Sequence, residues 1–126
     1  MTAPESAAPA AAHLPHQHGA ISAAAANLPA SEYFAPVSQV FKQLSDPCRC
    51  RIFLLLCHSE ECVINIAALM NMSSPAVAHH LRLLKVSGLI ESRREGKEVF
   101  YRACRTDLPR ALHRMIEQVM HLSCSA

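Results

Sequence analysis

The feature that most constrains this chain is a change in hydrophobic periodicity in its second half. Residues 61–70 and 76–86 carry apolar side chains at helical spacing, and a short polar turn separates the two stretches. Residues 89–94 and 98–103 instead alternate apolar and polar side chains on either side of a turn that contains Gly96. We therefore expect two short helices joined by a tight turn and followed by a β-hairpin.

Three further helices complete the expected domain. The first begins near Ser31, and the second covers 47–58, because Asp46 can cap its N-terminus and Pro47 suits its first turn. The third covers 106–123 and carries an apolar stripe of the kind that packs against a twin subunit. The stripe consists of Leu112, Met115, Ile116 and Val119. The expected fold is mainly α with a small β-hairpin, a dimeric winged helix-turn-helix.

Basic residues concentrate between positions 82 and 114, where the sequence has nine Arg or Lys and four acidic residues. Charge alone fits a solvated surface equally well, but on a helix-turn-helix it is typical of a polyanion binder. The second helix of such a fold reads the major groove, and the hairpin contacts phosphate or the minor groove. The candidate contacts to double-stranded DNA are Ser73, Ser74, Ala76, His79, His80 and Arg82 on the helix and Arg93, Arg94 and Lys97 on the hairpin.

The first 30 residues differ in composition from the rest. They hold 12 Ala, four Pro and one charged residue, which gives little apolar bulk to offset the entropy of ordering. We expect 1–30 to be a disordered Ala/Pro-rich tail and 31–124 to form the DNA-binding and dimerisation domain. The tail contains a histidine cluster that can catch a borderline metal ion or is an unselected polar stretch. Its members are His13, His16 and His18.

Other classes of protein are disfavoured by what the sequence lacks. No apolar run of about 18 residues could span a membrane, and the N-terminus lacks a secretion signal. We therefore expect a cytoplasmic protein without a membrane partner, whose six Cys are reduced thiols. The chain has three Gly in all and no phosphate loop or nucleophile motif, so an enzyme is not expected.

Four segments form a specific combination. They are Asp46-Pro47-x-Arg49-x-Arg51-Ile52, then Cys62-Val63-Ile64-Asn65-Ile66, then Ser73-Ser74-Pro75-Ala76-Val77-Ala78-His79-His80-Leu81-Arg82, then Arg94-Glu95-Gly96-Lys97. Together they resemble the ArsR/SmtB family of metal-sensing transcriptional repressors. The resemblance implies a homodimer whose first and last helices form the interface. It also implies that the protein binds its operator without a cofactor, and that repression is relieved when an inducer binds.

The resemblance points to Cys62 as a ligand for a soft metal or metalloid. Family members that sense such ions open the third helix with Cys-Val-Cys-Asp-Leu, whereas this chain has Ile64 at the second Cys. Arsenite, cadmium and lead prefer several thiolates, so the remaining donors must come from elsewhere. Cys48 and Cys50 are candidates, although a free Cys most often behaves as a small buried apolar residue.

The last helix offers two alternative sites for zinc, nickel or cobalt. The resemblance implies a site shared between subunits, to which Asp107 and His121 can contribute. Independently, four potential ligands fall at spacings that share one helix face, where they otherwise form a polar surface stripe. They are His113, Glu117, His121 and Cys124.

A further alternative is a repressor that senses persulfide or an oxidant. Some members that resemble this chain use one Cys in the second helix and one in the last, and Cys57 and Cys124 lie in those elements. A reactive thiol there needs exposure and a lowered pKa.

Overall fold

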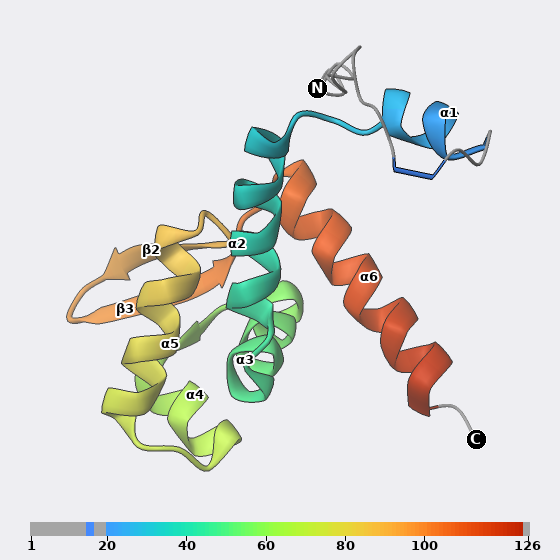
Figure 1. The fold of residues 1–126 in the computed structure, drawn as a ribbon. Coiled ribbons are helices and arrows are strands. Elements are labelled where there is room, and N and C mark those ends of the chain that lie inside the picture. The colour runs from blue at the N-terminus through green and yellow to red at the C-terminus, as the bar shows by residue number, and fades with distance from the viewer. Residues whose placement is uncertain (1–14, 17–19, 125–126) are drawn as a thin grey trace. The chain divides into compact units, whose positions relative to one another are not determined.

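The computed structural model describes residues 15–16 and 20–124 of the chain (Figure 1). The described residues before Lys42 and those from Lys42 onward form two separate units. Of the histidine cluster in the tail, His13 and His18 lie outside the described residues.

The first unit consists of short helices. α1 spans Ala20–Ala26, the 3-10 helix η1 spans Ser31–Tyr33, and α2 spans Phe34–Leu44, whose end belongs to the second unit. α1 lies inside the segment whose composition predicted no order. Its sequence AISAAAA is dominated by Ala, the residue with the highest intrinsic helix propensity.

The second unit is a winged helix-turn-helix (Figure 1). Its elements in chain order are α3 Pro47–His58, β1 Glu61–Cys62, α4 Val63–Met70, α5 Ser74–Val86, β2 Ile90–Glu95, β3 Glu98–Ala103 and α6 Asp107–Cys124. β2 and β3 form the expected hairpin, in which Arg94 lies opposite Val99. The mainly helical fold class is thus confirmed, and the hairpin belongs to a three-stranded antiparallel sheet in the order β1-β3-β2.

The third strand is the main departure from the expected element order. Glu61 and Cys62 were expected to open a helix, but they pair with Tyr101 and Phe100 of β3. α4 therefore begins only at Val63. A strand of two residues is too short to produce a periodic pattern in the sequence.

Side-chain caps and a left-handed residue set the helix ends, and the cap at Asp46 is the one expected from the sequence. The carboxylate of Asp46 accepts a hydrogen bond from the Arg49 backbone N–H at 2.9 Å, and Pro47 follows in the first turn of α3. The hydroxyl of Ser73 accepts from the backbone N–H of Ala76 and caps α5. Asn71 ends α4 with a φ of 54°, a conformation that Asn tolerates better than most residues. The left-handed Asn71 and the Ser73 cap together make the turn between α4 and α5 short and well defined.

The core of the second unit lies where α3, α4, α5 and the hairpin meet. Its fully buried apolar side chains include Ile52, Phe53, Ile66, Val77, Leu84 and Leu89. Burial of each such side chain stabilises the fold by about 1.5–3 kcal/mol relative to exposure. The core thereby fixes α5 and the hairpin against α3.

α6 presents part of its apolar stripe to solvent. Leu112 is buried, whereas Met115 and Val119 are exposed, Val119 to 55%. Leu122, one turn further along, is 73% exposed. Among the described residues, no helix combines the length and apolar character that a membrane span requires.

Candidate DNA-binding surface and metal centre

The outer face of α5 carries several of the residues expected to contact DNA. Ser73 and Ser74 are exposed at its start, Ala76 is half-buried, and His79 and Arg82 are exposed along it. Within the part of the chain that the structure describes, Arg82 has no ion-pair partner. This face therefore offers small residues, an imidazole and a free guanidinium to a groove.

His80 points toward the first turn of α3 rather than outward. Its Nδ1 lies 3.3 Å from Arg49 Nη1, and its Nε2 lies 3.9 Å from Asp46 Oδ1. Burial lowers the pKa of His80, which keeps the ring neutral at physiological pH. Arg49 also donates from Nε to the backbone oxygen of Gln43 at 2.6 Å. His80 thus joins the recognition helix to the beginning of α3.

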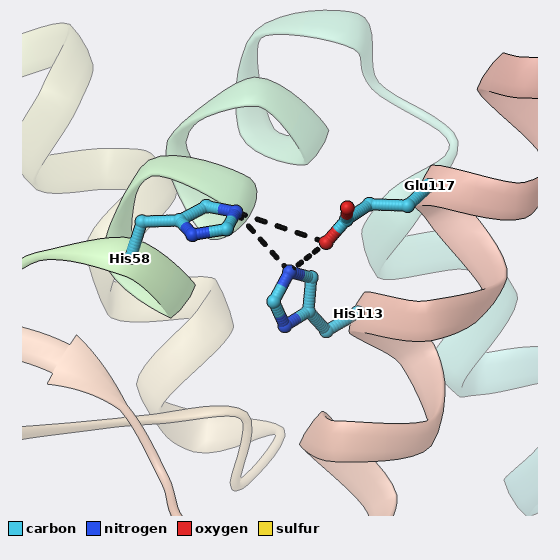
Figure 2. Close-up of side chains that lie close together, drawn as sticks. All are labelled: His58, His113 and Glu117. Carbon is cyan, nitrogen blue, oxygen red and sulfur yellow. Dashed lines mark hydrogen bonds and ion pairs between the residues drawn. The ribbon is translucent and has the colours of Figure 1, made fainter.

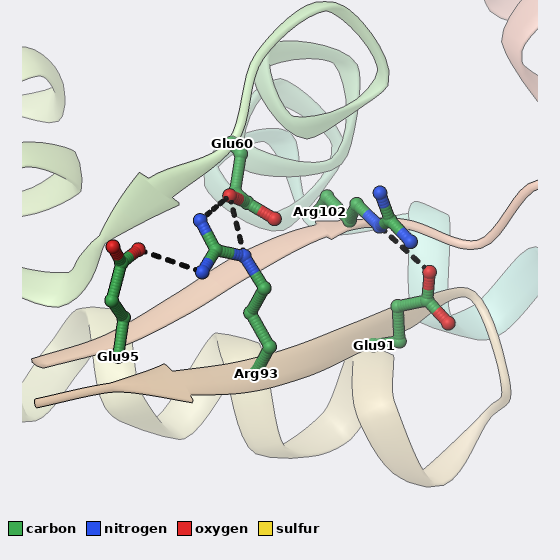
Figure 3. A network of polar contacts seen from close by, with 5 residues as sticks. All are labelled: Glu60, Glu91, Arg93, Glu95 and Arg102. Atoms are coloured by element: carbon green, nitrogen blue, oxygen red, sulfur yellow. Dashed lines mark hydrogen bonds and ion pairs between the residues drawn. The ribbon is translucent and has the colours of Figure 1, made fainter.

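The exposed side chain of Arg93 is held on the surface of the wing by two carboxylates (Figure 3). Its Nε donates to Glu60 at 2.8 Å and its Nη1 donates to Glu95 at 2.8 Å, while the guanidinium lies 4.9 Å from the centre of the Phe100 ring. These hydrogen bonds raise the pKa of Arg93 and lower the pKa of Glu60. On the same face, Arg102 donates to Glu91 at 2.8 Å. The sequence could not reveal that Arg93 already has anionic partners.

Arg94 lies on the opposite face of β2 from Arg93, because successive side chains of a strand alternate. Ser92 shares the face of Arg94 and accepts a hydrogen bond from Lys85 of α5 at 2.8 Å, so this face meets the recognition helix. Arg94 and Lys97 are exposed, and neither has an ion-pair partner among the described residues. The wing therefore offers two free cations beside α5.

The thiols do not converge on one site in the described part of the protein. Cys62 is half-buried at the N-cap position of α4, Cys48 is exposed, and Cys50 is half-buried with its pKa raised by burial. No ligand group of three His, Cys, Asp or Glu side chains includes any of them within the described residues. A thiolate site at Cys62 therefore requires donors from outside this set.

Asp107 and His121 are both exposed at opposite ends of α6. With a rise of about 1.5 Å per residue, they lie roughly 21 Å apart along the helix axis. One ion cannot bind both within a single protomer. The site implied by the resemblance therefore needs the second subunit.

Two of the four potential metal ligands predicted on α6 lie side by side, and a third potential ligand from another helix joins them (Figure 2). His113 and Glu117, one helical turn apart, form an ion pair. His58, the last residue of α3, lies next to both. His58 Nε2 lies 3.2 Å from His113 Nε2 and 3.7 Å from Glu117 Oε1. The sequence analysis missed His58, because it lies 55 residues from His113 and only the packing of α3 on α6 brings it close.

A cavity of about 460 Å³ opens beside this cluster. It is bounded by the end of α3, the end of β3 and the start of α6, and its lining includes Cys57, His58, Cys104 and His113. Burial, together with the charge of Glu117, raises the pKa of Cys57 to about 11. That thiol is protonated at neutral pH, which weighs against its expected role as a reactive cysteine.

The fold and these surfaces define a winged helix-turn-helix protein built to bind DNA. The family described as "Bacterial regulatory protein, arsR family" matches residues 46–92, which run from the cap of α3 into β2. The chain belongs to this ArsR/SmtB family of helix-turn-helix transcriptional regulators, a family of regulators rather than enzymes.

Three relatives illustrate the match. The cadmium resistance regulatory protein CadC homolog of Staphylococcus aureus is 44% identical over 66 residues, which cover 52% of this chain and 54% of that protein. The arsenic resistance regulator ArsR2 of Pseudomonas putida is 38% identical over 79 residues, which cover 62% of this chain and 68% of that protein. A homodimeric winged helix-turn-helix DNA-binding domain from Mycobacterium bovis aligns with a TM-score of 0.65 at 26% identity, over 89% of this chain and 94% of that one.

The extent of these matches is limited for some relatives. The chain spans about half the length of the CadC homolog and of the SmtB homolog of Synechocystis.

Proposed function

We propose that this chain is a homodimeric cytoplasmic repressor that binds double-stranded operator DNA and is released from it by a metal inducer. The observation that carries the DNA-binding part is the set of unpaired cations on one side of the second unit. They are Arg82 on α5 and Arg94 and Lys97 on the wing. Ser73, Ser74, Ala76 and His79 complete the proposed contact surface. His80 and Arg93 support it through their contacts with Arg49 and Glu60.

The homodimer is supported by the exposed apolar residues of α6. Met115, Val119 and Leu122 recur at helical spacing on that helix, and exposed apolar stripes commonly mark interaction surfaces. The relative from Mycobacterium bovis is described as homodimeric. A twofold dimer presents two equal α5 helices, so the operator we expect has dyad symmetry.

The metal inducer is supported by the relatives named for cadmium and arsenic resistance. In the hypothesis drawn from the sequence, a soft ion such as arsenite, cadmium or lead binds Cys62 and other thiols. Cys62 is half-buried at the start of α4 and has a free thiol. A soft ion needs more thiolates than this one, so the remaining ligands would come from the partner subunit or from other parts of this chain.

The DNA-binding part is tested by fluorescence anisotropy on the DNA upstream of the protein's own coding sequence. Arg82→Ala combined with Arg94→Ala should abolish binding while the fold and the dimer persist, because both side chains are exposed. The matched control is Arg110→Ala with Arg114→Ala, two exposed arginines of α6 outside the proposed surface. Unchanged operator binding by the first double variant would refute the assigned surface.

The inducer is tested by adding arsenite, cadmium, lead, zinc, nickel or a persulfide donor to the same complex. Release by a soft ion that Cys62→Ser abolishes, and that the matched control Cys104→Ser retains, would support the thiolate site. Release by zinc or nickel that survives Cys62→Ser would assign the inducer to α6 instead. Release by none of these ligands would refute a metal-responsive repressor.

A further inference from the structure

His58, His113 and Glu117 bring three potential metal-ligand atoms together at one place (Figure 2). In a tetrahedral zinc site with bonds of about 2.0–2.1 Å, ligand atoms lie about 3.3 Å from one another. The two Nε2 atoms are 3.2 Å apart, and His58 Nε2 is 3.7 Å from Glu117 Oε1. On these two edges the ligand atoms need to move by only a few tenths of an ångström to hold one ion. The third edge, between His113 Nε2 and Glu117 Oε1, is shorter than a metal site requires and must widen, which a rotation of the exposed Glu117 side chain allows.

The ligands converge from two rigid helices. His113 and Glu117 are four residues apart on α6, which places them on one face, and His58 ends α3. The rings of His58 and His113 meet edge to face at 90°, with their centres 4.7 Å apart. Two Nε2 atoms this close cannot both donate a proton to each other, whereas a cation between them satisfies both lone pairs.

We propose that His58, His113 and Glu117 of one protomer form a three-ligand site for a borderline divalent ion of the zinc, cobalt and nickel class. Two imidazoles and a carboxylate suit such ions, whereas arsenite and lead require thiolates. The adjacent cavity of about 460 Å³ gives the ion access and leaves a fourth position for water. This site uses neither the thiol of Cys62 nor the intersubunit pair of Asp107 and His121 that the family resemblance implies.

The site is connected to the recognition helix through α3. This helix has 12 residues and is about 18 Å long. Its last residue, His58, belongs to the metal cluster, whereas Asp46 and Arg49 at its beginning contact His80 of α5. An ion that fixes α6 to one end of α3 therefore acts on the helix whose other end positions α5.

This connection makes the cluster a regulatory site, an inference that rests on the proposed function. If the ion binds better to the arrangement with lower DNA affinity, operator binding and ion binding must oppose each other by linkage. The ion would then release the protein from DNA without any contribution from Cys62.

Metal binding is tested on the full metal-free chain with cobalt(II), whose d–d absorption reports tetrahedral coordination. We expect one cobalt per protomer in the wild type. Loss of a supporting residue around a metal site costs about 10–100-fold in affinity, so loss of a direct ligand should cost at least about 100-fold. The variants are His58→Gln, His113→Gln and Glu117→Gln, and the matched control is Glu98→Gln, which removes an exposed carboxylate of β3 outside every proposed metal site.

The proposed site requires all three ligand variants to lose cobalt affinity and Glu98→Gln to retain it. Unchanged affinity in His58→Gln, or lost affinity in Glu98→Gln, overturns the site as stated. The tail histidines are present in every variant and contribute the same background. Circular dichroism of the metal-free variants checks the fold, which we expect to persist because His58 and Glu117 are more than half exposed.

Regulation is tested by operator binding with and without saturating zinc. We expect zinc to weaken operator binding of the wild type by about 5–150-fold, the usual range of allosteric coupling, and to have no effect on His58→Gln. Equal operator affinity with and without zinc in the wild type would overturn the regulatory role while leaving the cobalt result intact. Failure of the metal-free protein to bind the operator at all would overturn the proposed function. The cobalt titration would still show whether His58, His113 and Glu117 bind a metal ion.

Discussion

The two free cations of the wing give a quantitative test of DNA binding. Arg94→Ala with Lys97→Ala removes both, and a homodimer has two wings, so about four phosphate contacts are lost per dimer. Each neutralised phosphate contributes about 0.9 to the slope of log affinity against log salt concentration. We therefore expect the slope to become shallower by about 3.6. Between about 50 and 200 mM salt, the wild type should then lose about 150-fold more affinity than the double variant.

The assay is fluorescence anisotropy on the operator at a series of salt concentrations. Arg110→Ala with Arg114→Ala is the matched control, because it removes two exposed arginines of α6 outside the proposed surface. We expect this control to leave the salt slope unchanged. The reasoning fails if the wing double variant keeps the wild-type slope, or if the control flattens the slope as much as the wing double variant does.

Three further predictions concern the core, the dimer and the cap of α3. Phe53→Ala should lower the free energy of unfolding in urea by about 3–5 kcal/mol, because the ring is fully buried. Met115→Glu with Val119→Glu should yield monomers in sedimentation, because it places charge on the exposed stripe of α6. The backbone N–H of Arg49 lowers the pKa of Asp46 below its ordinary value of 3.8. The carboxylate therefore adds stability that is fully present above pH 3.8 and is lost as the pH falls through the lower folded pKa. Asp46→Asn keeps the cap without this titration, so its thermal stability should approach that of the wild type as the pH falls below 3.8.

The core and dimer predictions each have a control on the same protein. Val86→Ala, at a residue 84% exposed, should change stability by no more than about 0.5 kcal/mol. Gln118→Glu adds a charge to α6 at an exposed polar position and should leave the dimer intact. The reason given for the core fails if Phe53→Ala is as stable as the wild type, and the reason given for the dimer fails if the charged variant stays dimeric. The reason given for the cap fails if the difference in thermal stability between wild type and Asp46→Asn persists in acid.

The sequence predicted the local signals of the fold well. Asp46 and Gly96 each act through their immediate neighbours, so a cap or a turn can be predicted from a few adjacent residues. The alternating pattern of the hairpin also depends only on residues close in the chain. By contrast, β1 was missed because its two residues form a strand only by pairing with Tyr101 and Phe100 of β3.

The candidate sites were less predictable, because their geometry depends on contacts between distant segments. Sequence reasoning placed His80 and Arg93 on the DNA side, but it could not see that Arg49 and Glu60 already contact them. It found the α6 half of the metal cluster from helical spacing and had no signal for His58, which only tertiary packing brings to α6.

The contact between Arg93 and Glu60 joins residues 33 positions apart and attaches the hairpin to the segment that follows α3. A wing held in this way has little conformational freedom left to lose when DNA arrives, so the entropic cost of docking it is reduced. The same contact uses one arginine as an internal counterion for Glu60 and Glu95. The single positive charge of Arg93 offsets one of the two negative charges, so the cluster opposes the positive field of Arg94 and Lys97 at the DNA less than two unpaired carboxylates would.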